Sequence, residues 1–257
     1  MITINGSNIF TEYGLMFQEL TGILDMPKRI GTISHDWGTS IEPFLDAADI
    51  EFDGRNFELK CFGEIPDMLF SGMIELGADW GTFNVYCQDE VKHDNKQLTI
   101  PLYEPKWIQP TVTGTASGGS GFRINGFNLY SDFGIIISEV NDYKNMPKRI
   151  SVDTTDYYRN TFYRDEGIMN LIGAFYGDIV TNISKFYALM SSEGMKTLLF
   201  PDNSEYQVYA ADGCKINEVY PNMATFQITL RRQAQEINIP IMSELGELIT
   251  AEDGQLI

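Results

Sequence analysis

The chain has 257 residues, 43% of them hydrophobic, and its 36 acidic against 18 basic residues give a formal net charge of −18. This hydrophobic content is ordinary for a globular protein, and no apolar run approaches the roughly 18 residues needed to span a membrane. We do not expect so acidic a chain to hold nucleic acid tightly, because duplex affinity comes mainly from cations that neutralise phosphates. Three widely spaced cysteines, Cys61, Cys87 and Cys214, are expected to be buried free thiols, as in a protein made in a reducing cytoplasm.

Residues 4–30 and 124–150 align without a gap, which indicates an internal repeat. They read INGSNIFTEYGLMFQELTGILDMPKRI and INGFNLYSDFGIIISEVNDYKNMPKRI, with eleven identical positions. An offset of 120 residues favours two domains of ordinary size. We expect a first domain over 1–112, a flexible linker of small polar residues over 113–121, a second domain over 122–232 and a C-terminal arm over 233–257.

Each repeat begins with the sequence signs of β-structure. An Asn-Gly pair, at residues 5–6 and again at 125–126, lies between alternating apolar and polar residues, which predicts a tight hairpin. The apolar runs at 14–20 and 134–140 are typical of buried strands. A proline follows each run at the same distance, where it suits an edge or a loop.

Further along, residues 49–63 predict a strand, a turn at Asp53-Gly54 and another strand. Residues 178–194 place apolar residues at helical spacing, between an aspartate that can cap the start and a glycine that can end the helix. A shorter helix is expected over 66–77, and strand-like stretches follow both helices. The sequence therefore predicts a mainly β fold with one helix per repeat (α+β), each copy being a small antiparallel β-barrel or sandwich.

The acidic sequence DIEFDGRNFELK (49–60) partly matches a calcium-binding loop. Asp49, Glu51 and Asp53 occupy its first ligand positions, but Lys60 stands where a bidentate glutamate is required. The acids also alternate with apolar residues, as in a half-exposed strand. We expect no metal site here.

Other sequence patterns that could suggest a catalytic or binding site lack a required residue or a required spacing. The glycine-rich residues 114–121 lack the lysine of a phosphate-binding loop, and neither His35 nor His93 has a partner at metal spacing. We therefore expect no catalytic residue, no metal and no cofactor, and hence no enzyme. Three tryptophans, Trp37, Trp80 and Trp107, leave open a carbohydrate-binding surface module or, less favoured, a glycan hydrolase.

The repeated openings INGSNIFTEYG (4–14) and INGFNLYSDFG (124–134), each followed by an apolar strand and a proline-containing loop, resemble the start of distal tail proteins of long-tailed bacteriophages. The family's first domain is related to the tail-tube fold. Family members usually carry one such domain, whereas this chain carries two. That departure moves the likeness toward tail hub proteins, which place two tube-like domains in one chain.

The resemblance implies a structural ring component of a virion tail, made in the bacterial cytoplasm. Its partners would be copies of itself, the tail tube and the tail tip proteins, and DNA would pass through without specific binding. A homotrimer with pseudo-six-fold symmetry is the favoured assembly, and a homohexamer is its rival.

Two groups of residues are candidates for contacts in such a ring. The four bases Lys28, Arg29, Lys148 and Arg149, from the repeated MPKRI sequence, are candidate contacts with acidic neighbours. The three acids Asp49, Glu51 and Asp53 are candidates for a negative wall around the DNA path.

Overall fold

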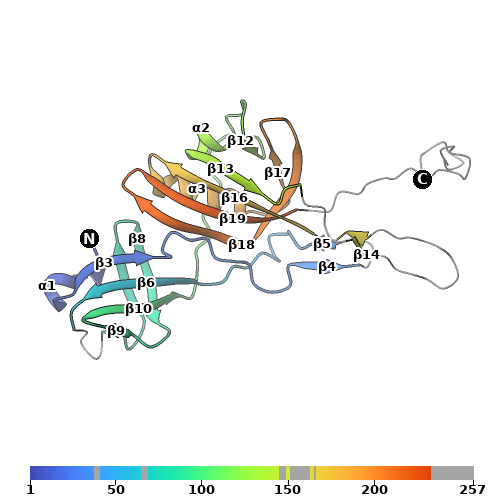
Figure 1. Ribbon diagram of the computed structural model, residues 1–257. Coiled ribbons are helices and arrows are strands. Elements are labelled where there is room, and N and C mark those ends of the chain that lie inside the picture. Colours follow the sequence, from blue (N-terminus) through green and yellow to red (C-terminus); the bar gives the residue numbers. More distant parts are fainter. Residues whose placement is uncertain (38–40, 65–68, 145–148, 151–162, 165, 233–257) are drawn as a thin grey trace, which may run out of the picture.

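The computed structural model describes residues 1–257 apart from 38–40, 65–68, 145–148, 151–162, 165 and 233–257. The described chain consists mostly of antiparallel β-structure in open sheets, with three helices (Figure 1). None of these helices has the length and apolar character needed to cross a membrane. The mainly β architecture agrees with the prediction from the alternating sequence pattern.

The first sheet has eight strands in the order β2-β1-β7-β8-β10-β6-β3, with β9 paired to β10. Its strands are β1 (Thr3–Ile4), β2 (Ser7–Asn8), β3 (Met16–Thr21), β6 (Arg55–Phe62), β7 (Ile74–Ala78), β8 (Gly81–Cys87), β9 (Lys92–Asp94) and β10 (Gln97–Glu104). Helix α1 (Ile9–Tyr13) lies between β2 and β3, and a separate hairpin of β4 (Ser34–Asp36) and β5 (Ile41–Pro43) follows β3.

The second sheet has seven strands in the order β12-β11-β17-β18-β19-β16-β13. Its strands are β11 (Arg123–Ile124), β12 (Phe127–Asn128), β13 (Ile135–Asn141), β16 (Gly167–Tyr176), β17 (Lys196–Leu199), β18 (Glu205–Tyr220) and β19 (Met223–Arg232). Helix α2 (Leu129–Phe133) lies between β12 and β13, and α3 (Ile179–Ser191) lies between β16 and β17. A hairpin of β14 (Arg149–Ile150) and β15 (Tyr163–Arg164) follows β13.

Both sheets follow one strand plan. When β1, β2, β3, β6, β7, β8 and β10 are matched in chain order with β11, β12, β13, β16, β17, β18 and β19, the two spatial orders are the same. An irregularity recurs as well. The register of β3 shifts between Phe17 and Glu19, and that of β13 shifts between Ile137 and Glu139, at the same offset as the sequence repeat.

The hairpins predicted from the Asn-Gly pairs form in both halves. Asn5 and Asn125 have positive φ values of 51° and 49°, and the glycine after each also has positive φ, as a tight hairpin requires. Asn5 N–H donates to Glu75 O at 2.8 Å, and its Oδ1 accepts from Glu75 N–H at 2.9 Å. Asn125 makes the same two bonds with Thr197, at 2.9 and 2.7 Å. Each asparagine therefore fastens its hairpin to the neighbouring strand.

The five-residue helices α1 and α2 were not predicted. Asn8 and Asn128 cap them, each side-chain oxygen accepting two backbone N–H groups of the first turn. Gly14 and Gly134 end them in the left-handed conformation that glycine adopts easily.

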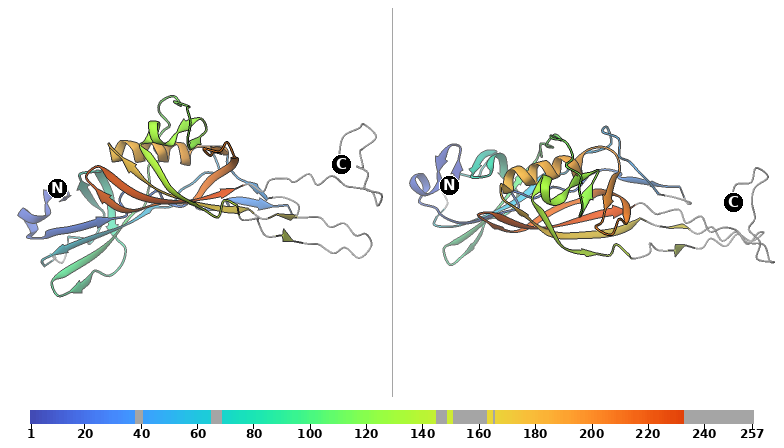
Figure 2. Two further views of the ribbon diagram at one scale, coloured as in Figure 1. Left: turned by 45° about the horizontal axis from the view of Figure 1, so that its top comes forward. Right: turned by 90° about the horizontal axis from the view of Figure 1, so that it is seen from above.

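Helix α3 lies over one face of the second sheet, as both views in Figure 2 show. Asp178 caps its start, as predicted, and buried residues at helical spacing such as Ile183 and Phe186 pack into the core. A buried lysine binds the backbone carbonyl groups that follow the last turn of α3. Lys196 Nζ donates to the carbonyl oxygens of Ser192, Glu193 and Gly194 at 2.9, 2.6 and 2.7 Å.

Two predictions in the first half are wrong in part. The helix expected over 66–77 does not form in its second part, because residues 74–78 are strand β7. Ile74 and Leu76 are buried on either side of exposed Glu75, and this period of two fits a strand. The strand expected over 49–53 is reduced to a single bridge between Phe52 and Arg29, whereas the strand after the turn forms as β6.

The linker expected over 113–121 contains no helix or strand, but it is bonded to the second half. Ser117 N–H and Oγ donate to Asp132 Oδ2 at 3.1 and 2.9 Å, and Asn128 Nδ2 donates to Ser120 O at 2.6 Å. The C-terminal arm predicted over 233–257 lies outside the described residues.

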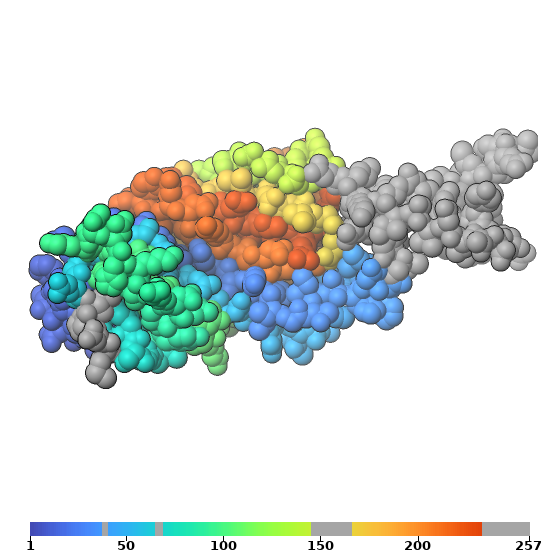
Figure 3. Space-filling view, turned by 60° about the horizontal axis from the view of Figure 1, so that its bottom comes forward, coloured from blue at the N-terminus to red at the C-terminus, as the bar shows by residue number. Residues whose placement is uncertain are grey.

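The two halves lie against each other through a long segment of the first half. After β3 the chain leaves its own sheet, and the β4–β5 hairpin extends alongside the second half (Figures 1 and 2). Figure 3 shows this blue segment lying against the orange and red surface of β18 and β19. One connected set of buried apolar residues includes members of both sheets.

Candidate assembly interface

The two halves meet where residues 22–30, here called the docking segment, run along β18. Met26 and Cys214 form an antiparallel bridge, in which Met26 N–H donates to Cys214 O at 2.9 Å and Cys214 N–H donates to Met26 O at 3.0 Å. Arg29 N–H donates to Ala211 O at 2.7 Å. Strand β17 pairs with β18 only as far as Val208. The docking segment therefore occupies an edge of β18 that β17 leaves open, and we call residues 208–216 the acceptor strand.

Gly213 makes this close approach possible. The register between β18 and β19 shifts between Ala210 and Cys214, and Gly213 lies in that bulge with φ of 77°. A Cβ atom at this position would lie 2.4 Å from Met26 O. Glycine is therefore required both for the backbone conformation and for the space.

Groups from α3 and β18 hold the docking segment. The buried Tyr187 hydroxyl on α3 donates to Leu24 O at 2.8 Å, and Asp25 Oδ1 accepts from Ile216 N–H at 2.8 Å. Leu24 and Met26 are buried. Since burying such a side chain contributes about 1.5–3 kcal/mol and a typical hydrogen bond about 1 kcal/mol net, apolar burial supplies much of the stabilisation.

Asp25 brings an acid into this largely apolar junction. Burial raises the pKa of Asp25 to about 6, although the hydrogen bond from Ile216 N–H and the charges of Lys215 and Arg55 lower it. The carboxylate is therefore charged at neutral pH at a cost in stability. In the second repeat the equivalent residue is Asn145, which carries no charge.

Arg29, a candidate for contact with a neighbouring chain, is buried within this one. The residue is 6% exposed, and its Nη2 donates to Phe44 O at 2.7 Å and Asp49 O at 3.2 Å. Nε and Nη1 have no hydrogen-bond partner among the described residues, and burial lowers the Arg29 pKa. The guanidinium thus ties the docking segment to the loop that returns to β6, inside one chain.

Of the other three candidate bases, the structure describes Lys28 and Arg149. Lys28 is exposed, between the buried residues Pro27 and Arg29. Lys148 lies outside the described residues. Arg149 is the first residue of β14, where it is paired with Arg164 of β15.

The three candidate wall acids also differ from one another. Asp49 and Glu51 are exposed, and they stay candidates. Asp53 is half-buried, and its Oδ1 accepts from Gly54 N–H at 2.8 Å and from the Tyr103 hydroxyl at 2.9 Å. That carboxylate orders the turn before β6, a role that the sequence prediction missed.

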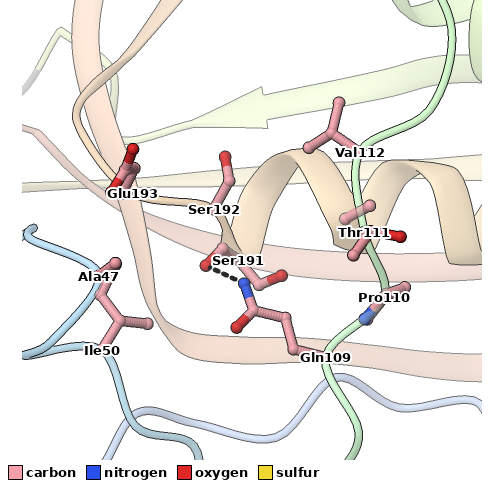
Figure 4. A pocket seen from close by; sticks show the side chains of 10 residues that line it. Ala47, Ile50, Gln109, Pro110, Thr111, Val112, Ser191, Ser192 and Glu193 are labelled. Carbon is pink, nitrogen blue, oxygen red and sulfur yellow. Dashed lines mark hydrogen bonds between the residues drawn. The ribbon is translucent and has the colours of Figure 1, made fainter.

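A cavity of about 330 Å³ lies beside the same junction. Figure 4 shows it between the loop carrying Ala47 and Ile50, the connection at 109–112 and the end of α3. Gln109 Nε2 donates to Ser191 O at 2.7 Å across one side. Among the described residues that line the cavity, Glu193 is the one ionisable side chain, and acid–base chemistry commonly needs a pair of such groups.

Chemical groups elsewhere in the described chain do not form a metal site. Among those residues, no cluster of three or more His, Cys, Asp or Glu side chains could hold a metal ion. The cysteines are free, as predicted, and Cys61 and Cys214 are buried whereas Cys87 is half-buried. Burial raises the pKa of Cys61 to about 11, so its thiol is not activated as a nucleophile.

The tryptophans considered as sugar-binding platforms lie in unlike places. Trp37 is 62% exposed, and its Nε1 donates to Glu42 Oε2 at 2.7 Å. Trp80 and Trp107 are partly buried against the core, and Trp107 meets the edge of Phe52 at 4.9 Å between ring centroids. These two rings have the packing role that is common for tryptophan.

Comparison with known proteins gives one distant structural likeness. No family model matches the chain, and no curated protein matches it. Among solved structures, the chain is similar to the Dit protein of phage SPP1, described as a paradigm of the hub adsorption apparatus in phages that infect Gram-positive bacteria. The identity is 10%, the TM-score is 0.25, and the match covers 91% of this chain and 99% of that chain.

Proposed function

We propose that the chain is a ring-forming structural protein of a bacteriophage tail tip, in the class of distal tail and hub proteins. The observation that carries this proposal is the repeated strand plan, found on the two stretches of sequence that resemble that family. On this proposal the chain is a tandem duplication of a tail-tube-like domain, with the first copy over 1–112 and the second over 122–232.

Details of the two halves support a duplication over independent similarity. The asparagine bonds of the hairpins, the caps of α1 and α2, and the register shifts in β3 and β13 all recur at an offset of 120 residues. Such features do not follow from strand order alone, because a bulge or a cap depends on the local sequence.

The junction within the chain supports a ring. A docking segment of one half lies on an acceptor strand of the other, so the contact joins two different surfaces. Contacts of this head-to-tail kind between similar units generate rings when the rotation closes, and filaments when it does not. A ring also covers strand edges that would otherwise be open to aggregation.

The favoured assembly is a homotrimer with six similar domains and pseudo-six-fold symmetry. Three chains of 29.1 kDa give about 87 kDa. A homohexamer with twelve domains is the rival. In either ring the protein would join the tail tube to the tip proteins, and exposed acids such as Asp49 and Glu51 would keep the wall of the DNA path negative.

Light scattering and electron microscopy of the purified full chain test this function. We expect a closed ring with a central hole, at the mass of three chains, and no retention on duplex DNA at moderate salt. A ring at the mass of six chains would replace the trimer with its rival. Tight DNA binding, or a compact particle without a hole, would contradict the proposed role.

A further inference from the structure

The acceptor strand of the second half has a counterpart in the first half. Val85 pairs with Ile74 on β7, and Val208 pairs with Lys196 at the equivalent place on β17. From this match, VYCQDEVKHD (85–94) aligns without a gap with VYAADGCKIN (208–217). Four positions are identical, with Val85, Tyr86, Asp89 and Lys92 matching Val208, Tyr209, Asp212 and Lys215.

The two acceptor strands differ in what covers them. In the second half Ala211 and Cys214 are each 3% exposed, beneath the docking segment. In the first half the counterpart of Ala211, Gln88, is exposed, and the counterpart of Cys214, Val91, is half-buried. Cys214 uses both its N–H and its C=O to bind Met26, whereas those groups of Val91 have no backbone partner within the described residues. The first half therefore presents an open acceptor strand.

The second half carries the matching docking sequence. NMPKRI at 145–150 repeats DMPKRI at 25–30 except for its first residue. The chain approaches both sequences through the same turn, since Gly22 and Asp142 have positive φ values of 81° and 65° directly beyond β3 and β13. Strand β14, which holds the end of the second sequence, lies on the side of the second half that faces away from the first sheet (Figures 1 and 2).

We propose that the MPKRI sequence at 146–150 of one chain docks on residues 86–92 of a second copy of this chain, in the register in which Met26 lies on Cys214. Met146 would then face Val91. This inference rests on the proposed function only in that both require chains to associate. It names the surface and the segment that make the contact between them.

Charge favours the same pairing. The open acceptor strand exposes Asp89 and Glu90, and the docking sequence offers Lys148 and Arg149. Opposite charges on facing surfaces steer association and disfavour wrong partners. One position departs from the template, because Glu90 stands where Gly213 makes room for Met26 O. The two strands therefore approach less closely at that point than they do within the chain.

Cysteine cross-linking tests the register. Residues directly opposite each other in an antiparallel pair have Cα atoms about 4.5–5.5 Å apart, and a disulfide spans up to about 6.8 Å, which leaves room for the looser approach beside Glu90. In a Cys87→Ser background, chains carrying Met146→Cys are mixed with chains carrying Val91→Cys and oxidised mildly. We expect severalfold more disulfide-linked dimer, at about 58 kDa from two chains of 29.1 kDa, than either variant gives alone.

Two controls define the result. Met26→Cys should form a disulfide with native Cys214 inside one chain, which verifies the template geometry. Met73→Cys replaces Val91→Cys as a more exposed cysteine outside residues 86–92, since Met73 is 57% exposed, and it should give no dimer above background. If light scattering shows assembled chains but the Val91–Met146 cross-link does not form, this contact is wrong, while the proposed ring is not contradicted. A chain that stays monomeric and uncross-linked would overturn both.

Discussion

A single carboxyl group makes the junction between the two halves sensitive to pH. The pKa of Asp25 is about 6 in the folded chain and 3.8 in the ordinary state, so the folded protein binds a proton that the unfolded chain has released between about pH 4 and pH 6. The contribution of Asp25 to the free energy of unfolding therefore falls as pH rises through this window. Above pH 6 the cost of the buried charge is constant.

We predict that Asp25→Asn stabilises the protein at pH 7, on the order of 2 kcal/mol. The asparagine oxygen can still accept from Ile216 N–H, and the second repeat already has asparagine at this position. Urea unfolding of both proteins should show the difference at pH 7 and its disappearance near pH 4. The exposed Asp46→Asn is the matched control, with an expected change within about 0.5 kcal/mol. A pH-independent gain would mean that charge burial is not the cause.

At the scale of elements, the bulge in β18 decides whether the docking segment fits. Gly213→Ala should destabilise the chain by more than 1 kcal/mol beyond the strain of positive φ, because its Cβ would meet Met26 O. Gly194→Ala is the matched control, since Gly194 has φ of 76° and nothing within 4 Å of a Cβ. The difference between their unfolding free energies measures the steric contribution. Equal losses in the two variants would show that the docking segment does not press on β18.

The elements that were predicted correctly are those whose structure depends on residues close together in the sequence. Asn-Gly pairs require positive φ, and the hairpins formed where they stand. Apolar spacing with a capping aspartate was enough to predict α3. The helix prediction over 66–77 failed because Ile74 and Leu76 alternate with Glu75 as in a strand, and β7 pairs with both β1 and β8. Helices α1 and α2 carry a local signal in the sequence, an asparagine six residues before a glycine.

The junction itself was beyond local reasoning. The sequence marked MPKRI as repeated but indicated neither that Met26 lies on β18 nor that Arg29 is buried. The similarity of residues 85–94 to 208–217 has an offset of 123, so it does not continue the 120-residue repeat. Only the sheet register aligns these two stretches, because unequal segments between them and the first repeat shift the numbering.

At the scale of the whole molecule, the two copies of MPKRI should respond differently to the same change. Lys148→Glu is expected to weaken association between chains at least tenfold, because it places a negative charge opposite Asp89 and Glu90, and like charges across an interface cost several kcal/mol. Lys28→Glu is the matched control, since Lys28 is exposed at the junction within the chain. Light scattering against concentration gives both association constants. Equal weakening by the two substitutions would contradict the assignment of the second copy to the contact between chains.

Because both halves belong to one chain, the contact within the chain and the contact between chains need different strengths. The joint at Met26 and Cys214 is intramolecular, so its two surfaces meet at an effective concentration that short connections place in the millimolar range. A contact within one chain tolerates a destabilising residue such as Asp25, because the high effective concentration compensates for part of the lost contact free energy. A joint between separate chains has no such help at the far lower concentrations of a cell, and there the repeat places the uncharged Asn145. In the proposed trimer, covalent linkage halves the number of domain contacts that must form between separate chains. The contacts within a chain and the contacts between chains can therefore differ in strength.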